Sequence, residues 1–164
     1  MGQLQGWFYQ VDADRSGAID LNELSRAQWP HGRPFEPATL RKLMRVFDVD
    51  FSGSISFFEF AALHKFVGSL QQAFQYCDRD RSWTLDPGEL HMALTQAGLP
   101  VDPESMHSIL LRYSRQGHVS FDNFVALSVQ LAHIRAVFEK HARGGAAATF
   151  TWPQFMKICT NLSE

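Results

Sequence analysis

The stretch Asp12-Ala13-Asp14-Arg15-Ser16-Gly17-Ala18-Ile19-Asp20-Leu21-Asn22-Glu23 decides the fold of this chain. Its oxygen-bearing side chains stand at alternate positions, so their oxygens can converge on one point. Gly17 occupies the sixth position, where a sharp turn is easiest for a residue without a Cβ atom. The spacing therefore predicts a loop that wraps around a small ligand.

The donor atoms of this loop favour calcium as the ligand. A hard divalent cation takes about six to eight oxygen ligands, and carboxylates, a hydroxyl, a backbone carbonyl and a water can supply them here. The predicted ligands are Asp12, Asp14, Ser16, Ala18, Asp20 and Glu23. The alternative is a turn followed by an ordinary capping box, because Asp20 and Glu23 also fit that motif. A chance match to the whole pattern is on the order of one in a million per position, so we interpret the stretch as an EF-hand loop.

A second copy of the pattern spans residues 48–59. Its predicted ligands are Asp48, Asp50, Ser52, Ser54 and Glu59. The loop carries Ser56 at the ninth position, where the first loop has an aspartate. Because ligand charge tunes affinity, we expect this loop to bind more weakly than the first. The alternative is an intact loop that stays empty at resting calcium levels.

A third copy spans residues 78–89 and has one marked departure. Its predicted ligands are Asp78, Asp80, Ser82, Thr84 and Glu89, but Trp83 stands where glycine is expected. A bulky residue at positive φ costs roughly 1–3 kcal/mol. Convergence of the carboxylates on a divalent ion can outweigh that cost, so we expect binding at lowered affinity. The opposing hypothesis is a damaged loop that keeps its shape without metal.

Two further units lack the calcium-ligand pattern of the first three loops. Residues 114–123 form a shorter segment that ends in Asn123, and residues 143–151 carry no carboxylate. An apolar residue still recurs at intervals of about thirty to thirty-six positions, which is the sign of a repeat. These residues are Ile19, Ile55, Leu85, Val119 and Phe150. The chain therefore contains five units, at about 3–30, 38–66, 68–97, 102–130 and 132–162.

Apolar residues spaced by three and four predict helices on both sides of every loop. The first leaving helix is expected to run from Leu21 to Trp29-Pro30, and the proline-free stretches 57–77 and 121–140 predict long helices shared by neighbouring units. The predicted fold is a single all-α domain of five helix-loop-helix units in two lobes. Short β-contacts pair the first loop with the second and the third with the fourth.

An odd number of units leaves the fifth without a partner. Its unpaired loop and apolar flank are most simply covered by the fifth unit of another chain across a two-fold axis. The residues predicted to form this dimer interface are Phe138, Phe150, Trp152, Phe155 and Ile158.

Composition excludes several classes of function. A net charge of −2 without a basic run argues against nucleic-acid binding. The two cysteines have no metal or redox spacing, which favours a reduced intracellular setting. No apolar run is long enough to span a bilayer, and no signal peptide is expected. We find no nucleophile with its base, no phosphate-binding glycine loop and no zinc spacing, so we do not expect an enzyme.

Together these features resemble the penta-EF-hand family. The match covers nearly the whole chain, with five units, shared long helices and a degenerate last pair. The segments 12–17, 78–82 and 115–117 are similar to the branch that contains the apoptosis-linked-gene-two protein and peflin. Trp29 and the Pro34-Phe35 pair resemble the linker between the first two units of that branch.

This resemblance implies a cytoplasmic calcium sensor. It implies homo- or heterodimerisation through the fifth unit, calcium-dependent binding of protein partners, often through proline-rich segments, and reversible association with membranes. On calcium binding, Glu23, Glu59 and Glu89 are expected to swing onto the ion and reorient their helices, which opens apolar surface. Candidate partner contacts are Trp29, Phe35, Phe57, Phe58 and Trp83. The alternatives are a calcium buffer that barely opens, or the regulatory subunit of a calpain-like protease, against which the complete first loop argues.

Overall fold

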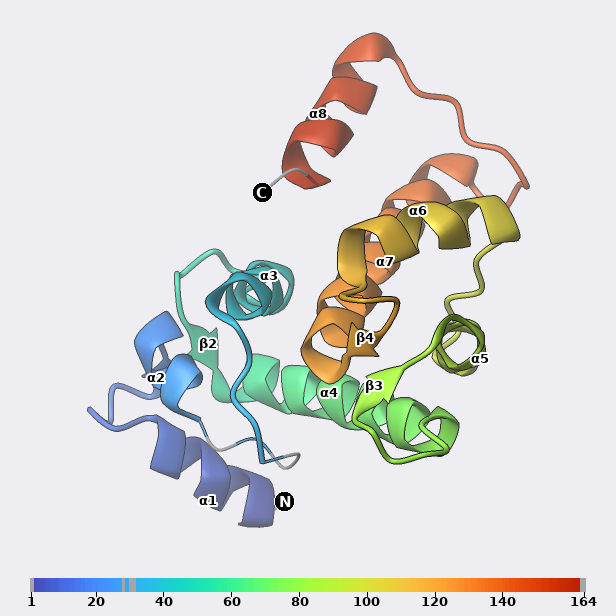
Figure 1. Ribbon diagram of the computed structural model, residues 1–164. Coiled ribbons are helices and arrows are strands. Elements are labelled where there is room, and N and C mark those ends of the chain that lie inside the picture. The colour runs from blue at the N-terminus through green and yellow to red at the C-terminus, as the bar shows by residue number, and fades with distance from the viewer. Residues whose placement is uncertain (1, 28, 30–31, 163–164) are drawn as a thin grey trace.

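The computed structural model describes residues 2–27, 29 and 32–162, and within them the chain folds into eight helices and four two-residue strands (Figure 1). The first two units contain α1 (Gly2–Val11), β1 (Ala18–Ile19), α2 (Leu21–Arg26), α3 (Pro37–Phe47) and β2 (Ile55–Ser56). The remaining elements are α4 (Phe57–Cys77), β3 (Thr84–Leu85), α5 (Pro87–Gln96), α6 (Pro103–Tyr113), β4 (Val119–Ser120), α7 (Phe121–Ala142) and α8 (Trp152–Leu162). The predicted all-α fold is confirmed.

Each acidic loop passes into its leaving helix through a reciprocal cap. Asp20, Ser56 and Asp86 are the N-caps of α2, α4 and α5, and each accepts a hydrogen bond from the backbone three residues on. The glutamate at that third position reaches back to the N-cap backbone, which completes a capping box. The same glutamates are the predicted calcium ligands. Each one therefore caps its leaving helix and is also the last residue of its loop.

The predicted β-contacts are also confirmed. Ile19 pairs with Ile55 in an antiparallel ladder, and Leu85 pairs with Val119 in a second one. All four side chains are fully buried and belong to the hydrophobic core. Phe150, the fifth residue of the repeat, belongs to no strand in the described part of the chain and packs against the ring of His141 at 4.7 Å. Among the residues that the structure describes, the fifth loop therefore has no β-partner.

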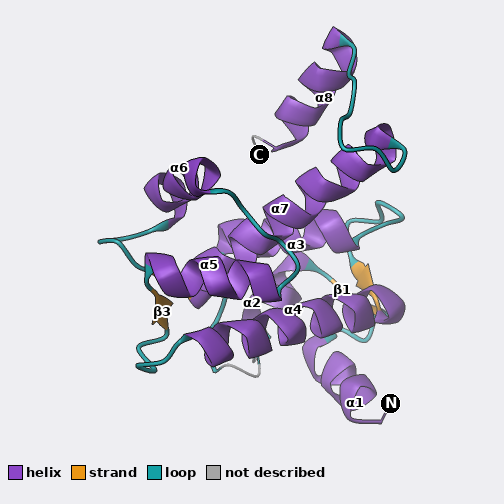
Figure 2. Cartoon of the chain, turned by 90° about the vertical axis from the view of Figure 1, so that its right-hand side faces the viewer, coloured by secondary structure: helices purple, strands orange, loops and turns teal. Residues whose placement is uncertain are grey.

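Two long helices carry the core. α4 runs beneath α3 and α7 in both views of the chain (Figures 1 and 2), and it continues through Gly68 without interruption. Its apolar face buries Phe60 and Phe74, and Phe74 meets Phe121 and Phe124 of α7 at ring distances of 5.2 and 5.7 Å. Within the described residues, no helix combines the length and apolarity needed to cross a bilayer.

The first leaving helix is shorter than predicted. It ends at Arg26 rather than at Trp29-Pro30, because Ala27 adopts an extended backbone with ψ of 132°. Position 30 lies outside the described residues. Trp29 is only 3% exposed and packs edge-on against Trp7 and Phe35, so its burial draws the chain out of the helical path.

A half-buried carboxylate joins the start of α3 to α7. Asp122, in the first turn of α7, accepts a hydrogen bond from the backbone N–H of Glu36 and another from the hydroxyl of Thr39, both at 2.8 Å. Burial raises the pKa of Asp122, although these two donors partly offset the effect. The start of α3 is thus anchored to α7, against which it packs.

We expect the substitution Asp122→Ala to lower the free energy of unfolding by about 1–3 kcal/mol, because two donors lose a charged acceptor. The isosteric Thr39→Val removes one of the two bonds and should cost about half as much. Urea unfolding in chelator measures both values, and the exposed Glu104→Ala serves as control. Equal stability of Asp122→Ala and the parent would contradict this account of the anchor.

Candidate metal centre

The first loop folds around its own carboxylates. Asp12 is 2% exposed, and its Oδ1 and Oδ2 accept hydrogen bonds from the N–H groups of Ser16 and Gly17 at 2.9 and 3.0 Å. Gly17 has the predicted left-handed backbone, with φ of 86°. The N–H of Ser16 also donates to Asp14 and, with the Ser16 hydroxyl, lowers the pKa of Asp14. These N–H groups therefore hold the carboxylates of Asp12 and Asp14 close together.

Glu23 closes the loop from the first turn of α2. Its Oε1 accepts a hydrogen bond from the N–H of Ala13, and its Oε2 accepts one from the N–H of Asp20, both at 2.9 Å. Glu23 therefore lies over the loop in this structure, held by both of these N–H groups.

The converging oxygens fit calcium. One carboxylate oxygen from each of Asp12, Asp14 and Glu23 lies within 4.8 Å of the others. Calcium binds oxygen at about 2.3–2.6 Å, so ligands on opposite sides of one ion lie about 4.6–5.2 Å apart. The three carboxylates can therefore contact a single ion together.

The second loop repeats this geometry. Oxygens of Asp48, Asp50 and Glu59 also lie within 4.8 Å of one another. Glu59 is 8% exposed and accepts hydrogen bonds from the N–H groups of Val49 and Ser56, both at 2.8 Å. Burial raises the pKa of Glu59, but the hydrogen bonds from Ser56 and Val49 outweigh it and hold the pKa below its usual value.

The third loop has the same frame in a looser form. Trp83 adopts the left-handed backbone that glycine would, with φ of 60°, and its N–H donates to Asp78 Oδ2 at 3.0 Å. Glu89 accepts from the N–H groups of Arg79 and Asp86 at 3.2 and 3.1 Å, which are longer than in the first two loops. In the described part of the chain, only the first two loops bring three carboxylates within 4.8 Å.

The fourth loop closes with an amide instead of a metal. Asn123 occupies the place of the closing glutamate, and its Nδ2 donates to the backbone carbonyl of Tyr113 at 2.8 Å. Arg115 and His118 form a short β-bridge that tightens the turn. Asn123 was predicted only as a lost ligand, and this hydrogen bond was not predicted. The signal for the bond was an amide, which can donate, at a position where calcium loops carry a carboxylate, which can only accept.

Two of the candidate partner contacts belong to the core. Trp29 and Phe35 are 3% and 4% exposed, which rules them out as surface contacts in this structure. Phe57 and Trp83 are half-buried, whereas Phe58 is 84% exposed.

Comparison with known proteins places this geometry in a family. Residues 3–65 match the family model described as an EF-hand domain pair. The chain is 34% identical to mouse sorcin over 160 residues, covering 94% of this chain and 80% of sorcin. It is 36% identical to the penta-EF hand domain-containing protein 2 of Dictyostelium discoideum over 138 residues, covering 84% of this chain and 67% of that protein. It is 34% identical to Xenopus laevis peflin, of which it spans 56%.

A solved structure extends the likeness to three dimensions. The homolog of programmed cell death 6 protein from Leishmania major Friedlin matches 97% of this chain and 93% of its own, with a TM-score of 0.75 and 34% sequence identity. The sequence comparison with sorcin and the structural comparison both cover more than nine-tenths of this chain. The chain therefore belongs to the penta-EF-hand family of calcium-binding proteins.

Proposed function

We propose that this chain is a calcium sensor and adaptor, which exposes apolar surface on calcium binding and recruits partner proteins. The observation that carries the proposal is the convergence of three carboxylates in each of the first two loops. Like charges this close repel one another, so an arrangement that gathers them is suited to a cation. The role is one of binding, and we assign no catalytic residue.

The proposed ligands come from three loops. They are Asp12, Asp14, Ser16, Ala18, Asp20 and Glu23 in the first, Asp48, Asp50, Ser52, Ser54 and Glu59 in the second, and Asp78, Asp80, Ser82, Thr84 and Glu89 in the third. Hydroxyls of Ser16, Ser52 and Ser82 donate to the carbonyls of the seventh loop residues, at 2.8, 3.0 and 2.9 Å. These oxygens therefore face one another, as common ligation would require.

Ligation couples to the helices through the closing glutamates. Each one stands in the first turn of a leaving helix and also bonds to the second residue of its loop. An ion that draws the glutamate inward therefore moves the helix with it. Phe58, beside Glu59 at the start of α4, is the most exposed aromatic side chain on a leaving helix.

A calcium buffer is the second candidate. Glu23 and Glu59 already lie over their loops, which leaves less distance for the leaving helices to travel. Buffer EF-hands barely open on binding, whereas sensors expose an apolar groove.

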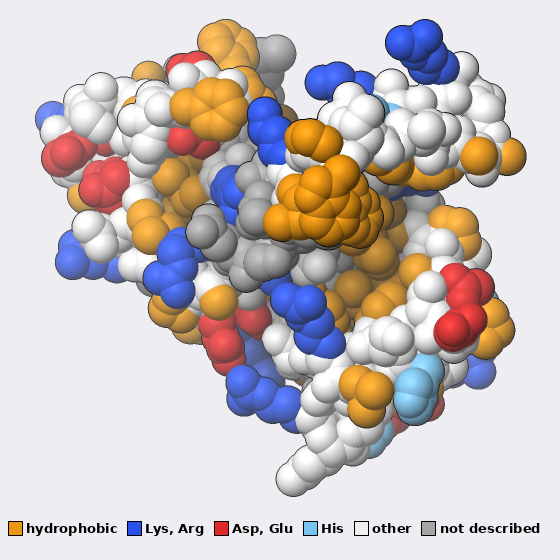
Figure 3. Space-filling model, turned by 90° about the horizontal axis from the view of Figure 1, so that it is seen from above, with side chains coloured by type: hydrophobic (Ala, Val, Ile, Leu, Met, Phe, Trp, Pro, Cys, Tyr) orange, Lys and Arg blue, Asp and Glu red, His pale blue; other side chains and the backbone are white. Residues whose placement is uncertain are grey.

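We further propose that the chain dimerises through its fifth unit. Exposed apolar side chains gather near the middle of the face seen from above, on the side where α8 lies (Figure 3). Trp152 of α8 is 70% exposed and Phe155 is 48% exposed, while Phe138 of α7 is 39% exposed. Together with the half-buried Phe150 and Ile158, they offer a patch that a second copy can cover.

Calorimetry tests the ligand assignment. We expect Glu23→Gln to weaken the strongest calcium site at least about tenfold, about 1.4 kcal/mol, because the substitution removes a bidentate carboxylate. Glu139→Gln, on the exposed face of α7, is the matched control and should bind as the parent does. Unchanged affinity in Glu23→Gln would contradict the assignment.

Fluorescence of an apolar dye separates sensor from buffer. A sensor should bind more dye in calcium than in chelator, and Glu23→Gln combined with Glu59→Gln should abolish most of the increase. If the dye signal is the same in calcium and in chelator while calorimetry shows binding, the chain is a buffer.

Light scattering tests the dimer. The parent should be a dimer at micromolar concentration, and Trp152→Ala combined with Phe155→Ala should give a monomer, because the apolar area buried across the two-fold axis is lost. Leu111→Ala removes an apolar side chain that is 75% exposed elsewhere, on α6, and should leave the mass unchanged. A monomeric parent at high micromolar concentration would defeat the proposal.

A further inference from the structure

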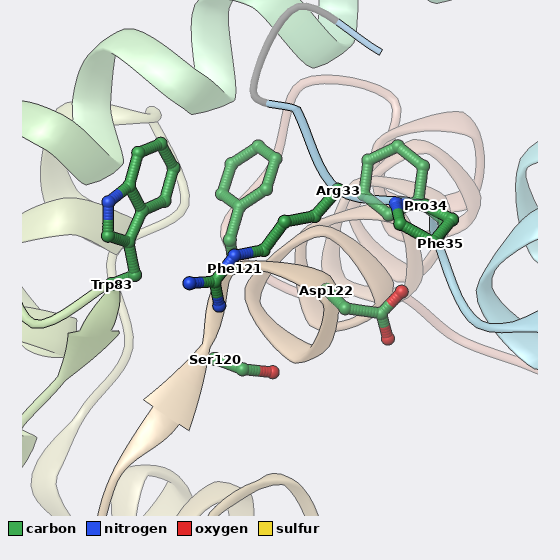
Figure 4. A pocket seen from close by; sticks show the side chains of 7 residues that line it. All are labelled: Arg33, Pro34, Phe35, Trp83, Ser120, Phe121 and Asp122. Atoms are coloured by element: carbon green, nitrogen blue, oxygen red, sulfur yellow. The ribbon is translucent and has the colours of Figure 1, made fainter. Parts of the chain in front are cut away.

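The linker between the first two units lies against the third loop. A cavity of about 110 Å³ separates them (Figure 4). One wall comes from Arg33, Pro34 and Phe35 of the linker, and the other comes from Trp83 and from Phe121 and Asp122 at the start of α7. The figure shows the Arg33 side chain extending across this space toward Trp83.

The position of the Trp83 ring depends on the shape of the third loop. The N–H of Trp83 donates to Asp78, the first proposed ligand, and the left-handed backbone fixes the direction in which the side chain leaves the loop. The indole stacks on Phe74 of α4 at 6.4 Å with an interplanar angle of 30°. A change in the loop around Asp78 must therefore shift the ring.

Arg33 of the linker also contacts the Trp83 ring. Its guanidinium carbon lies 5.8 Å from the centroid of the Trp83 ring, within the range of a cation–π interaction. Arg33 precedes Phe35, whose buried ring packs against Phe121, and Glu36, whose N–H bonds to Asp122. The next residue begins α3, which ends beside Asp48 of the second loop. A series of contacts thus connects the third loop to the second.

In the third loop, which carries Trp83, the closing glutamate forms longer hydrogen bonds with the second loop residue and with the N-cap than in the other two acidic loops. The Glu89 oxygens lie 3.2 and 3.1 Å from their backbone donors, against 2.8 Å for both Glu59 bonds. The Trp83 ring contacts both Phe74 and Arg33. Tightening the loop around an ion would require the ring to move against both.

We propose that Arg33 acts as a latch on Trp83, which holds the third loop in its loose, low-affinity form and couples calcium binding there to the linker into the second unit. This inference rests on the proposed function, since it requires calcium in the third loop. Coupling of this kind is reciprocal, so calcium in the third loop weakens the latch to the same degree that the latch weakens calcium binding.

Calorimetry can isolate the third loop in a parent that carries Glu23→Gln and Glu59→Gln. In that parent, Arg33→Ala should raise calcium affinity about two- to fivefold, the range expected for loss of an exposed cation–π contact. Arg41→Ala removes an exposed arginine from α3 and should change nothing. Trp83→Gly should raise affinity further, and Arg33→Ala should add nothing in that background, because the contact is already gone.

Three outcomes would overturn the latch. Arg33→Ala could leave third-loop affinity unchanged or reduce it. It could raise affinity by the same factor with Trp83→Gly present, which would indicate long-range charge instead of contact. The third loop could stay empty in every variant, Trp83→Gly included. Calcium binding by the unsubstituted chain tests the proposed function separately, and circular dichroism verifies that each variant folds.

Discussion

The fold depends on holding like charges together. In the first two loops, three carboxylates approach within 4.8 Å, and backbone N–H groups directed at their oxygens make that approach tolerable. Those N–H groups can point inward only if the chain turns sharply, which fixes Gly17 and Gly53 in the left-handed region. The same turn places Ile19 where it pairs with Ile55. The backbone conformation that gathers the carboxylates therefore also pairs the two loops.

The closing glutamates connect this electrostatic centre to the helices. Each closing glutamate bonds to the N-cap of its helix and to the second residue of its loop. A shift of this side chain therefore alters the helix start and the loop together. The fourth unit keeps the shape with a different bond, since the amide of Asn123 takes over the crossing and binds a carbonyl. The fourth unit thus lacks the calcium ligands but keeps the loop shape, and its strand still pairs with that of the third loop. In the described part of the chain the fifth unit forms no ladder, and its apolar side chains Trp152 and Phe155 are exposed.

Local patterns predicted most of this architecture, because loops, caps and long helices are each specified by residues close in the sequence. The periodic apolar residues of α4 and α7 and the recurring ladder residues needed no long-range information. The features that escaped prediction are contacts between distant segments. Asp122 and Glu36 are 86 positions apart, and no local spacing links them. The early end of α2 likewise follows from the burial of Trp29 against Trp7 and Phe35, which only the folded chain brings together. The left-handed backbone of Trp83 was foreseen, but its contact with Arg33 was not.

The central claim is that the gathered oxygens of residues 12–23 exist to hold a calcium ion. The most direct measurement is a crystal structure from millimolar calcium, recorded at a wavelength where calcium scatters anomalously. The account predicts an anomalous peak in the first loop, with oxygens of Asp12, Asp14 and Glu23 about 2.3–2.6 Å away. Well-ordered density for water alone inside that loop would contradict it.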